Sequence, residues 1–100
     1  MIPRWYLSAA AIRHYLALAE ITDDDGGPQW AAAERAVATI CADAHLVRDD
    51  PAAQRQSWRS AGKVEVGGRK IRLDLVVSTA PRREGPLPQL IAITNKDARK

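Results

Sequence analysis

The chain has 100 residues and a mass of 11.0 kDa, which fits one domain and excludes a protein with two substrate-binding domains. Hydrophobic residues make up 46% and charged residues 27%, a composition typical of globular proteins and not of disordered ones. One cysteine excludes an internal disulfide framework, and no apolar run approaches the roughly 18 residues that a membrane span needs. Without a recognisable secretory signal, we expect a cytoplasmic protein that has no membrane partner.

Charge divides the chain into two unlike halves. Residues 1–50 hold four Arg or Lys against eight Asp or Glu, a net charge of −4, whereas residues 51–100 hold eleven against four, a net charge of +7. Such polarity suggests an anionic partner for the basic half, and nucleic acid is the commonest one. A basic solvated surface, balanced by the acidic half in the folded state, and an acidic protein partner are the alternatives.

A first helix is expected over about residues 8–21. Ser8 can cap it, because the serine hydroxyl can accept a hydrogen bond from an amide of the first turn. Ile12 and Leu16 recur at helical spacing and predict one buried face. Three aspartates at 23–25 follow, and we expect them to lie in a loop.

A second helix is expected over about residues 29–47. Pro28 fits its first turn, where a missing amide is tolerated. Val37 and Cys41 continue the apolar helical period. The helix should end before Pro51, since a proline disfavours helical backbone angles at the residue that precedes it.

From Trp58 the apolar period changes to two, which predicts a sheet over about residues 58–94. Residues 63–66 form the first clear strand. Gly67 and Gly68 then predict a two-residue hairpin turn, because both positions of the favoured turn need positive φ. Residues 71–77 alternate between an apolar face and a mixed face and give the clearest strand of the chain.

The last part of the chain is expected to hold a loop, a strand and a tail. Residues 81–88 contain three prolines, which predict a stiff basic loop. Residues 89–94 predict a final strand, and residues 95–100 a polar tail. Two helices followed by three or four strands predict an α+β fold. The helices should pack on one face of a small antiparallel sheet, and the whole chain should be a single domain.

Basic residues of the predicted strands and their connections are the main candidates for binding nucleic acid or a partner. Guanidinium groups bind phosphate through paired hydrogen bonds and keep their proton. Trp58 lies between two arginines and could either stack on an exposed RNA base or anchor the core at the sheet edge. The candidate binding residues are Arg55, Trp58, Arg59, Arg69, Lys70, Arg82 and Arg83.

Metal and cofactor chemistry finds little support in the sequence. Cys41 and His45 are four residues apart on the predicted second helix, but two ligands do not make a zinc site. Cys41 also falls on the buried stripe of that helix, where a thiol is inert. The two glycine pairs lack the strand–loop–helix context of a phosphate loop. We therefore predict no metal and no cofactor.

The layout as a whole resembles a family of small toxins. Its features, in chain order, are a helix with Ile12-Arg13-His14-Tyr15, an alanine-rich second helix, and a basic meander that ends in a hydrophobic strand with Thr94. Over residues 8–94 this order resembles the ribonuclease-toxin superfamily of RelE/ParE-like toxins and barnase-like domains. The resemblance implies metal-independent cleavage of RNA.

By this resemblance three residues would form a catalytic site. His14 would move the proton, Arg72 would stabilise the charge that develops at phosphorus, and Thr94 would contact the phosphate. RNA is thus the favoured partner, and an antitoxin is the protein partner that such a toxin implies.

The rival interpretation is a non-enzymatic protein of a phage or mobile element that binds and inhibits a target enzyme. The basic loop 81–88 would be its contact surface, with Leu87 and Leu90 as apolar anchors beside the arginines. Self-association is a third interpretation, since an open strand edge at 63–66 could pair with a second copy. A dimer is therefore left open.

Overall fold

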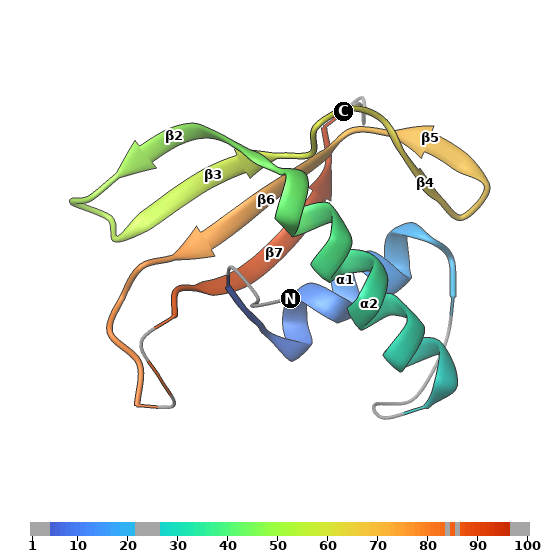
Figure 1. Ribbon diagram of the computed structural model, residues 1–100, viewed down its shortest axis with the longest axis horizontal. Coiled ribbons are helices and arrows are strands. Elements are labelled where there is room, and N and C mark those ends of the chain that lie inside the picture. The colour runs from blue at the N-terminus through green and yellow to red at the C-terminus, as the bar shows by residue number, and fades with distance from the viewer. Residues whose placement is uncertain (1–4, 22–26, 84, 86, 97–100) are drawn as a thin grey trace.

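The computed structural model describes residues 5–21, 27–83, 85 and 87–96, and it has the predicted α+β fold. Figure 1 shows both helices together on one side of a curved sheet, with a separate two-stranded ribbon beyond its end. In chain order the elements are β1 (Tyr6–Leu7), α1 (Ala9–Leu18), α2 (Pro28–Asp43), β2 (His45–Asp50), β3 (Arg55–Arg59), β4 (Val64–Val66), β5 (Arg69–Ile71), β6 (Leu73–Ser78) and β7 (Gln89–Asn95).

The main sheet is larger than the three or four strands expected over residues 58–94. Its strand order is β1-β7-β6-β3-β2. All neighbours are antiparallel except β1, which runs parallel to β7, so the sheet is mixed. The two edge strands, β1 and β2, both precede the predicted range. Two residues of β1 are too few to show a period, and β2 continues directly from a helical pattern.

Helix α1 begins as predicted and ends earlier. The Ser8 hydroxyl accepts a hydrogen bond from the backbone N–H of Ala11 at 3.1 Å, which confirms the cap. The helix stops at Leu18 and not at residue 21, because Glu20 adopts a positive φ of 59° and Ile21 N–H donates back to the Leu16 carbonyl. The expected aspartate loop lies outside the described residues.

Helix α2 begins at Pro28 as predicted, but it ends at Asp43 and not at residue 47. Ala44 turns the chain into an extended conformation with ψ of 151°, and His45 starts β2. The backbone of β2 finds its hydrogen-bond partners on β3, where Leu46 lies opposite Trp58. Pairing with a distant strand thus replaces the local helix.

The β4–β5 ribbon confirms the glycine turn, because Gly67 and Gly68 have φ of 59° and 81°. The ribbon is a sheet of its own, in which β4 pairs with β5 alone among the described strands, so the strand at 63–66 has one unpaired edge. It rests on the end of α1, where Arg69 Nη2 donates to the Leu18 carbonyl at 3.1 Å. A Cβ atom at Gly67 would lie 2.8 Å from the Ala19 carbonyl oxygen, so only glycine fits this approach.

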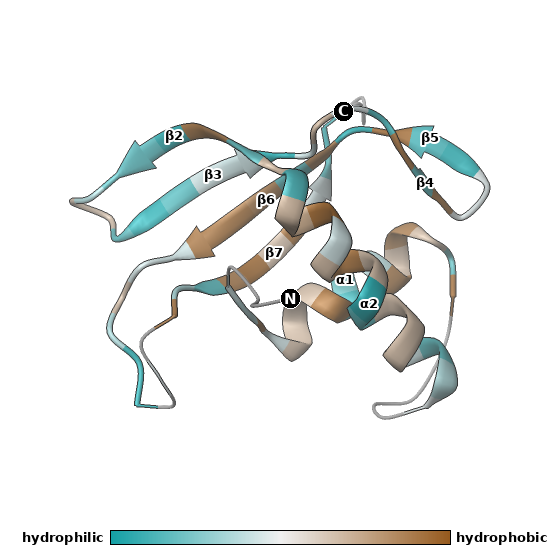
Figure 2. Cartoon of the chain, in the orientation of Figure 1, coloured by the Kyte–Doolittle hydropathy of each residue, from teal (hydrophilic) through white to brown (hydrophobic). Residues whose placement is uncertain are grey.

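The core lies between the helices and the inner face of the sheet. Strand β6 alternates fully buried and half-buried residues, which confirms the predicted period of two. Figure 2 shows β6 and β7 as strongly hydrophobic stretches of the sheet. The best-buried large aliphatic side chains of the core are Ile12, Leu16, Val37, Val66, Leu73, Leu75, Val77, Leu90 and Ile93. In Figure 1 both helices lie on the same side of the sheet, and α1 also borders β7, whose Ile93 N–H donates to Nδ1 of His14 at 3.3 Å.

Candidate nucleic-acid interface

The outer face of the sheet carries one guanidinium group on each of several consecutive rows. In an antiparallel sheet, residues directly opposite each other lie on the same face. Asp74, Val76 and Ser78 point outward because their neighbours on β6 fill the core. The register then places Arg55 between Ser78 and Asp50, and Arg48 beside Ser57 on the Val76 row. Arg59 lies between Asp74 and His45, and Thr94 is on the far side of Asp74.

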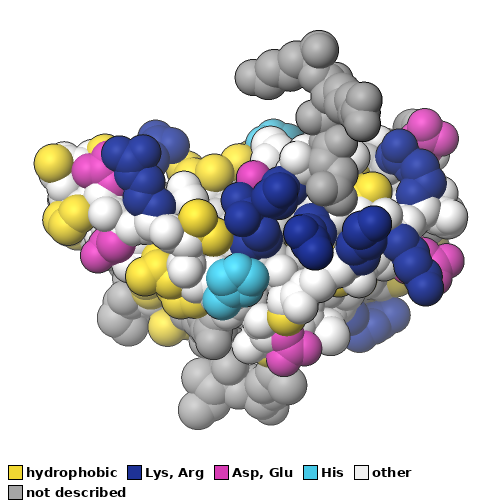
Figure 3. All heavy atoms as spheres, turned by 90° about the horizontal axis from the view of Figure 1, so that it is seen from above, with side chains coloured by type: hydrophobic (Ala, Val, Ile, Leu, Met, Phe, Trp, Pro, Cys, Tyr) yellow, Lys and Arg dark blue, Asp and Glu magenta, His cyan; other side chains and the backbone are white. Residues whose placement is uncertain are grey.

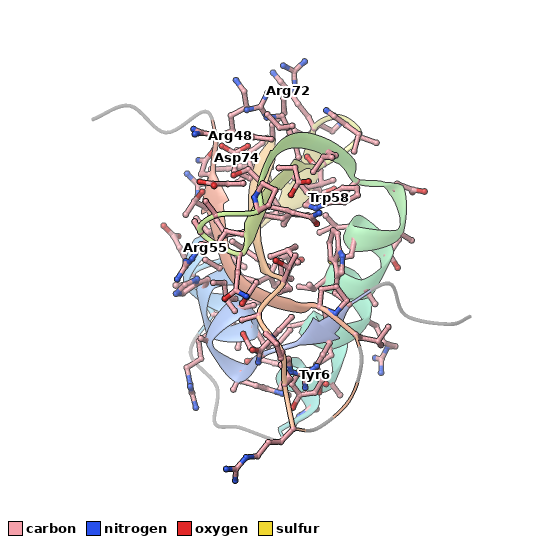
Figure 4. All side chains as sticks on the ribbon, turned by 90° about the vertical axis from the view of Figure 1, so that its left-hand side faces the viewer. Tyr6, Arg48, Arg55, Trp58, Arg72 and Asp74 are labelled. Atoms are coloured by element: carbon pink, nitrogen blue, oxygen red, sulfur yellow. The ribbon has the colours of Figure 1, made fainter. Side chains whose placement is uncertain are left out.

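Arg72 comes directly before β6, two residues before Asp74, so the alternation of β6 extended by one residue adds Arg72 to this series. We call Arg55, Arg48, Arg59 and Arg72 the arginine track. Two residues of a strand advance about 7 Å, so the track extends over about 20 Å. Figure 3 shows the Lys and Arg side chains spread across this face, from the β2–β3 hairpin to the ribbon. Figure 4 shows Arg48, Arg55 and Asp74 on the side of the sheet away from α2, with Arg72 at the upper end of the molecule.

Two acidic residues share rows with these arginines. Asp50 lies opposite Arg55, and its Oδ1 accepts a hydrogen bond from the Ala53 N–H at 3.2 Å. Asp74 lies opposite Arg59, which compensates its charge. The Arg59 Nε donates to Asp74 Oδ1 at 2.9 Å, and the two side chains are 30% and 36% exposed. Exposed ion pairs contribute little to stability. The pair nevertheless leaves the terminal N–H groups of the Arg59 guanidinium for other acceptors, since that group has five donors.

A cleft of about 730 Å³ opens where α1 meets the far edge of β7. We call it the α1–β7 cleft, and its lining residues are His14, Ala17, Leu18, Asp74, Ile93, Thr94, Asn95 and Lys96. The backbone N–H of Ile93 donates to Nδ1 of His14 at 3.3 Å. This hydrogen bond assigns the proton of the neutral imidazole to Nε2, because Nδ1 serves as the acceptor.

The structure brings two of the three expected catalytic residues together. His14 and Thr94 line the α1–β7 cleft, from α1 and β7 respectively. Arg72 does not line it, but the Arg72 carbonyl accepts a hydrogen bond from the backbone N–H of Lys96, which does. Arg72 therefore lies next to the rim of the cleft, on the track.

Trp58 lies on the inner face of the sheet, away from the arginine track. Its ring meets that of Trp5 edge to face, with the centroids 5.0 Å apart, and its Nε1 donates to Gln56 Oε1 at 3.0 Å. Trp58 packs against the core, which is the placement that an anchor of the core requires.

The other expected binding residues lie apart from the track. Arg69 and Lys70 are on the ribbon strand β5. In the loop after β6, Arg82 donates from Nη1 to the Leu87 carbonyl at 2.9 Å. The Arg82 guanidinium also stacks over the Tyr6 ring at 4.1 Å, so this residue holds the loop to β1. Arg83 is exposed. Binding of a protein partner by this loop stays a prediction.

Arg48 and His45 are basic residues of the outer face that sequence reasoning did not assign to a binding surface. They follow a helical pattern without a break, and no alternation marks β2 as a strand. Cys41 is buried in α2, whereas His45 is exposed on β2, so the two do not share a helix. No group of three or more His, Cys, Asp or Glu residues in the described ranges could hold a metal ion.

Comparisons with protein-family models, with curated proteins and with solved structures found no match. Within the described part of the chain, neither helix has the length and apolar character that a membrane crossing needs. The case for a function therefore depends on the arginine track and the α1–β7 cleft.

Proposed function

We propose that this protein acts on RNA by binding a single strand along the arginine track. The observation that carries the proposal is the succession of Arg55, Arg48 and Arg59 on consecutive outward rows, with Arg72 one step beyond. Steps of about 7 Å are close to the separation of phosphates in an extended nucleic-acid strand. Guanidinium groups bind phosphate through paired hydrogen bonds, so each could hold one phosphate of such a strand.

The shape of the surface favours a single strand over a duplex. The major groove of DNA admits a helix or a two-stranded ribbon, whereas the outer face here is the broad side of a sheet. Single-stranded nucleic acids bind to open, positively charged surfaces of this kind.

Hydroxyl groups beside the arginines favour RNA over DNA. Ser78 lies directly opposite Arg55 and Ser57 directly opposite Arg48, whereas Thr94 is on the Arg59 row with Asp74 between them. A guanidinium that holds a phosphate would thus have a hydroxyl nearby that could hydrogen-bond to a ribose 2′-hydroxyl. That group is what distinguishes RNA from DNA at a binding site.

Fluorescence anisotropy with a labelled eight-nucleotide RNA tests the proposal. Replacing Arg48 and Arg55 by Gln should weaken binding about tenfold or more, because two phosphate contacts are lost. The matched control replaces Arg35 of α2 and Arg83 of the loop by Gln, which removes the same net charge elsewhere and should change the affinity less than threefold. Equal losses in the two variants would mean that net charge alone attracts RNA and would refute the track.

Cleavage of RNA is the second candidate function, and the observation in its favour is that His14 and Thr94 line one cleft. In such a reaction the 2′-hydroxyl attacks the phosphorus and loses its proton to a base, while the bond to the 5′-oxygen breaks and that oxygen gains a proton. Arg72, beside the rim, would stabilise the negative charge that develops on the non-bridging oxygens of the phosphate. The Ile93 N–H occupies Nδ1 of His14, so Nε2 carries the proton and is a hydrogen-bond donor.

With this geometry, His14 is better suited to donate a hydrogen bond to a phosphate oxygen than to accept a proton from the 2′-hydroxyl. We therefore place binding first. Incubating RNA with the wild type and with His14→Ala separates the two functions. Binding alone predicts intact RNA with both proteins. Cleavage that disappears in a folded His14→Ala protein would establish the nuclease instead.

A further inference from the structure

The α1–β7 cleft has the size and lining of a site for a flat, partly polar molecule. Its volume of about 730 Å³ is within the range of small-ligand sites. Ala17 and Leu18 of α1 and Ile93 of β7 supply an apolar wall. The His14 ring adds a planar surface, and histidine is one of the side chains on which RNA bases stack.

Polar groups converge on the same cleft with hydrogen-bonding capacity to spare. Asp74 uses Oδ1 for Arg59, and no other hydrogen bond to its carboxylate occurs among the described residues. The Thr94 hydroxyl likewise has no hydrogen-bond partner within the described part of the chain. His14 presents Nε2–H and Lys96 its ammonium group. The cleft thus offers a carboxylate acceptor, a hydroxyl and two donors.

Asp74 belongs to both surfaces, because it lines the cleft and shares its row with Arg59 of the arginine track. A phosphate held by Arg59 would therefore place the adjoining nucleotide at the mouth of the cleft. This continuity indicates that the occupant is part of the strand bound on the track.

We infer that the α1–β7 cleft binds one base of the RNA strand and selects a base with an exocyclic amino group. This inference rests on the proposed function. The amino group donates to Asp74, as carboxylates do with cytosine N4. Cytosine and uracil have the same shape but differ at this position, where uracil carries a carbonyl oxygen. A uracil oxygen facing the carboxylate would leave two acceptors opposed, so the cleft discriminates against uracil.

The experiment compares oligocytidine and oligouridine of eight nucleotides by fluorescence anisotropy. The wild type should bind oligocytidine on the order of tenfold more tightly than oligouridine. In Asp74→Ala this ratio should fall to about one, whatever happens to the overall affinity. The control Asp43→Ala, on α2, removes the same charge away from the cleft and should keep the wild-type ratio.

A second measurement makes the inference independent of the track. Cytidine and uridine, which carry no phosphate, are titrated into the wild type at millimolar concentration, and the NMR signals of the His14 ring and the Leu18 methyl groups are followed. Cytidine should shift these signals and uridine should not.

The outcomes separate the cleft from the track. Equal affinities for the two oligonucleotides, together with unshifted His14 and Leu18 signals, would overturn the cleft and leave RNA binding by the track intact. If cytidine shifted these signals, but replacing Arg48 and Arg55 left the RNA affinity unchanged, base binding in the cleft would be supported and RNA binding by the track would be overturned.

Discussion

The two faces of the main sheet are built from alternate residues of the same strands, yet they serve different ends. On the inner face Leu73, Leu75 and Val77 are completely buried against the helices. Their outward neighbours, such as Asp74 and Ser78, lie among the arginines of the track. Successive residues of β3 and β6 alternate between the two faces. A substitution at an inward residue should therefore change the free energy of unfolding, and one at an outward residue should change the affinity for RNA.

The largest expected effect is on the inner face. Leu75→Ala leaves a cavity under the centre of the sheet and should lower the free energy of unfolding by about 2–5 kcal/mol, measured by urea denaturation. Val76→Ala, on the outer face of the same strand, is the control and should cost less, because Val76 is only half buried. Equal losses from the two substitutions would contradict the assignment of the faces.

A smaller loss is expected at the ribbon, which belongs to neither face. Gly67→Ala combines a positive φ with a Cβ atom 2.8 Å from the Ala19 carbonyl oxygen, and it should destabilise the protein by about 1–3 kcal/mol. Gly68→Ala is the matched control: its φ is also positive, but a Cβ there meets nothing within 4 Å. If thermal denaturation showed the same loss of stability for both variants, the close approach of Gly67 to the end of α1 would not contribute to stability.

On the outer face, removing a hydroxyl group should change the preference for RNA and leave the free energy of unfolding unchanged. Ser57→Ala should reduce the preference for RNA over DNA of the same sequence by about twofold to tenfold, because it removes a partner of the 2′-hydroxyl. The affinity for DNA should stay unchanged. A parallel loss for both nucleic acids in anisotropy titrations would assign Ser57 to phosphate binding and not to sugar recognition.

The smallest effect concerns alkaline stability. Burial raises the pKa of the Tyr15 phenol above 10, its ordinary value. The unfolded chain therefore releases this proton at lower pH than the folded protein, and stability should fall as the pH rises above about 10. Tyr15→Phe should make the free energy of unfolding less dependent on pH in that range. An unchanged dependence would mean that Tyr15 is not the group responsible.

Local signals in the sequence were sufficient for those parts of the fold that local chemistry decides. The Ser8 cap, the Gly67-Gly68 turn and the alternation in β6 each depend on residues close together in the chain, and the structure confirms all three. The end of α2 could not be predicted, because β3 supplies the hydrogen bonds that turn residues 45–50 into a strand.

The candidate site divides in the same way. Arg55 and Arg59 could be selected from their place in a basic segment, whereas Arg48 joins them only through the pairing of β2 with β3. The contact between His14 and Ile93 joins residues 79 positions apart, and no pattern near either residue indicates it. Side-chain placement across elements needs the packed structure.

The salt dependence of RNA binding tests the arginine track most directly. Four phosphate contacts on a single strand predict a slope of about −3 in a plot of log affinity against log salt concentration. The Arg48→Gln, Arg55→Gln protein should show a slope about half as steep, because two of the four contacts are gone. A slope near zero for the wild type, or an unchanged slope in the double variant, would contradict RNA binding by the outer face.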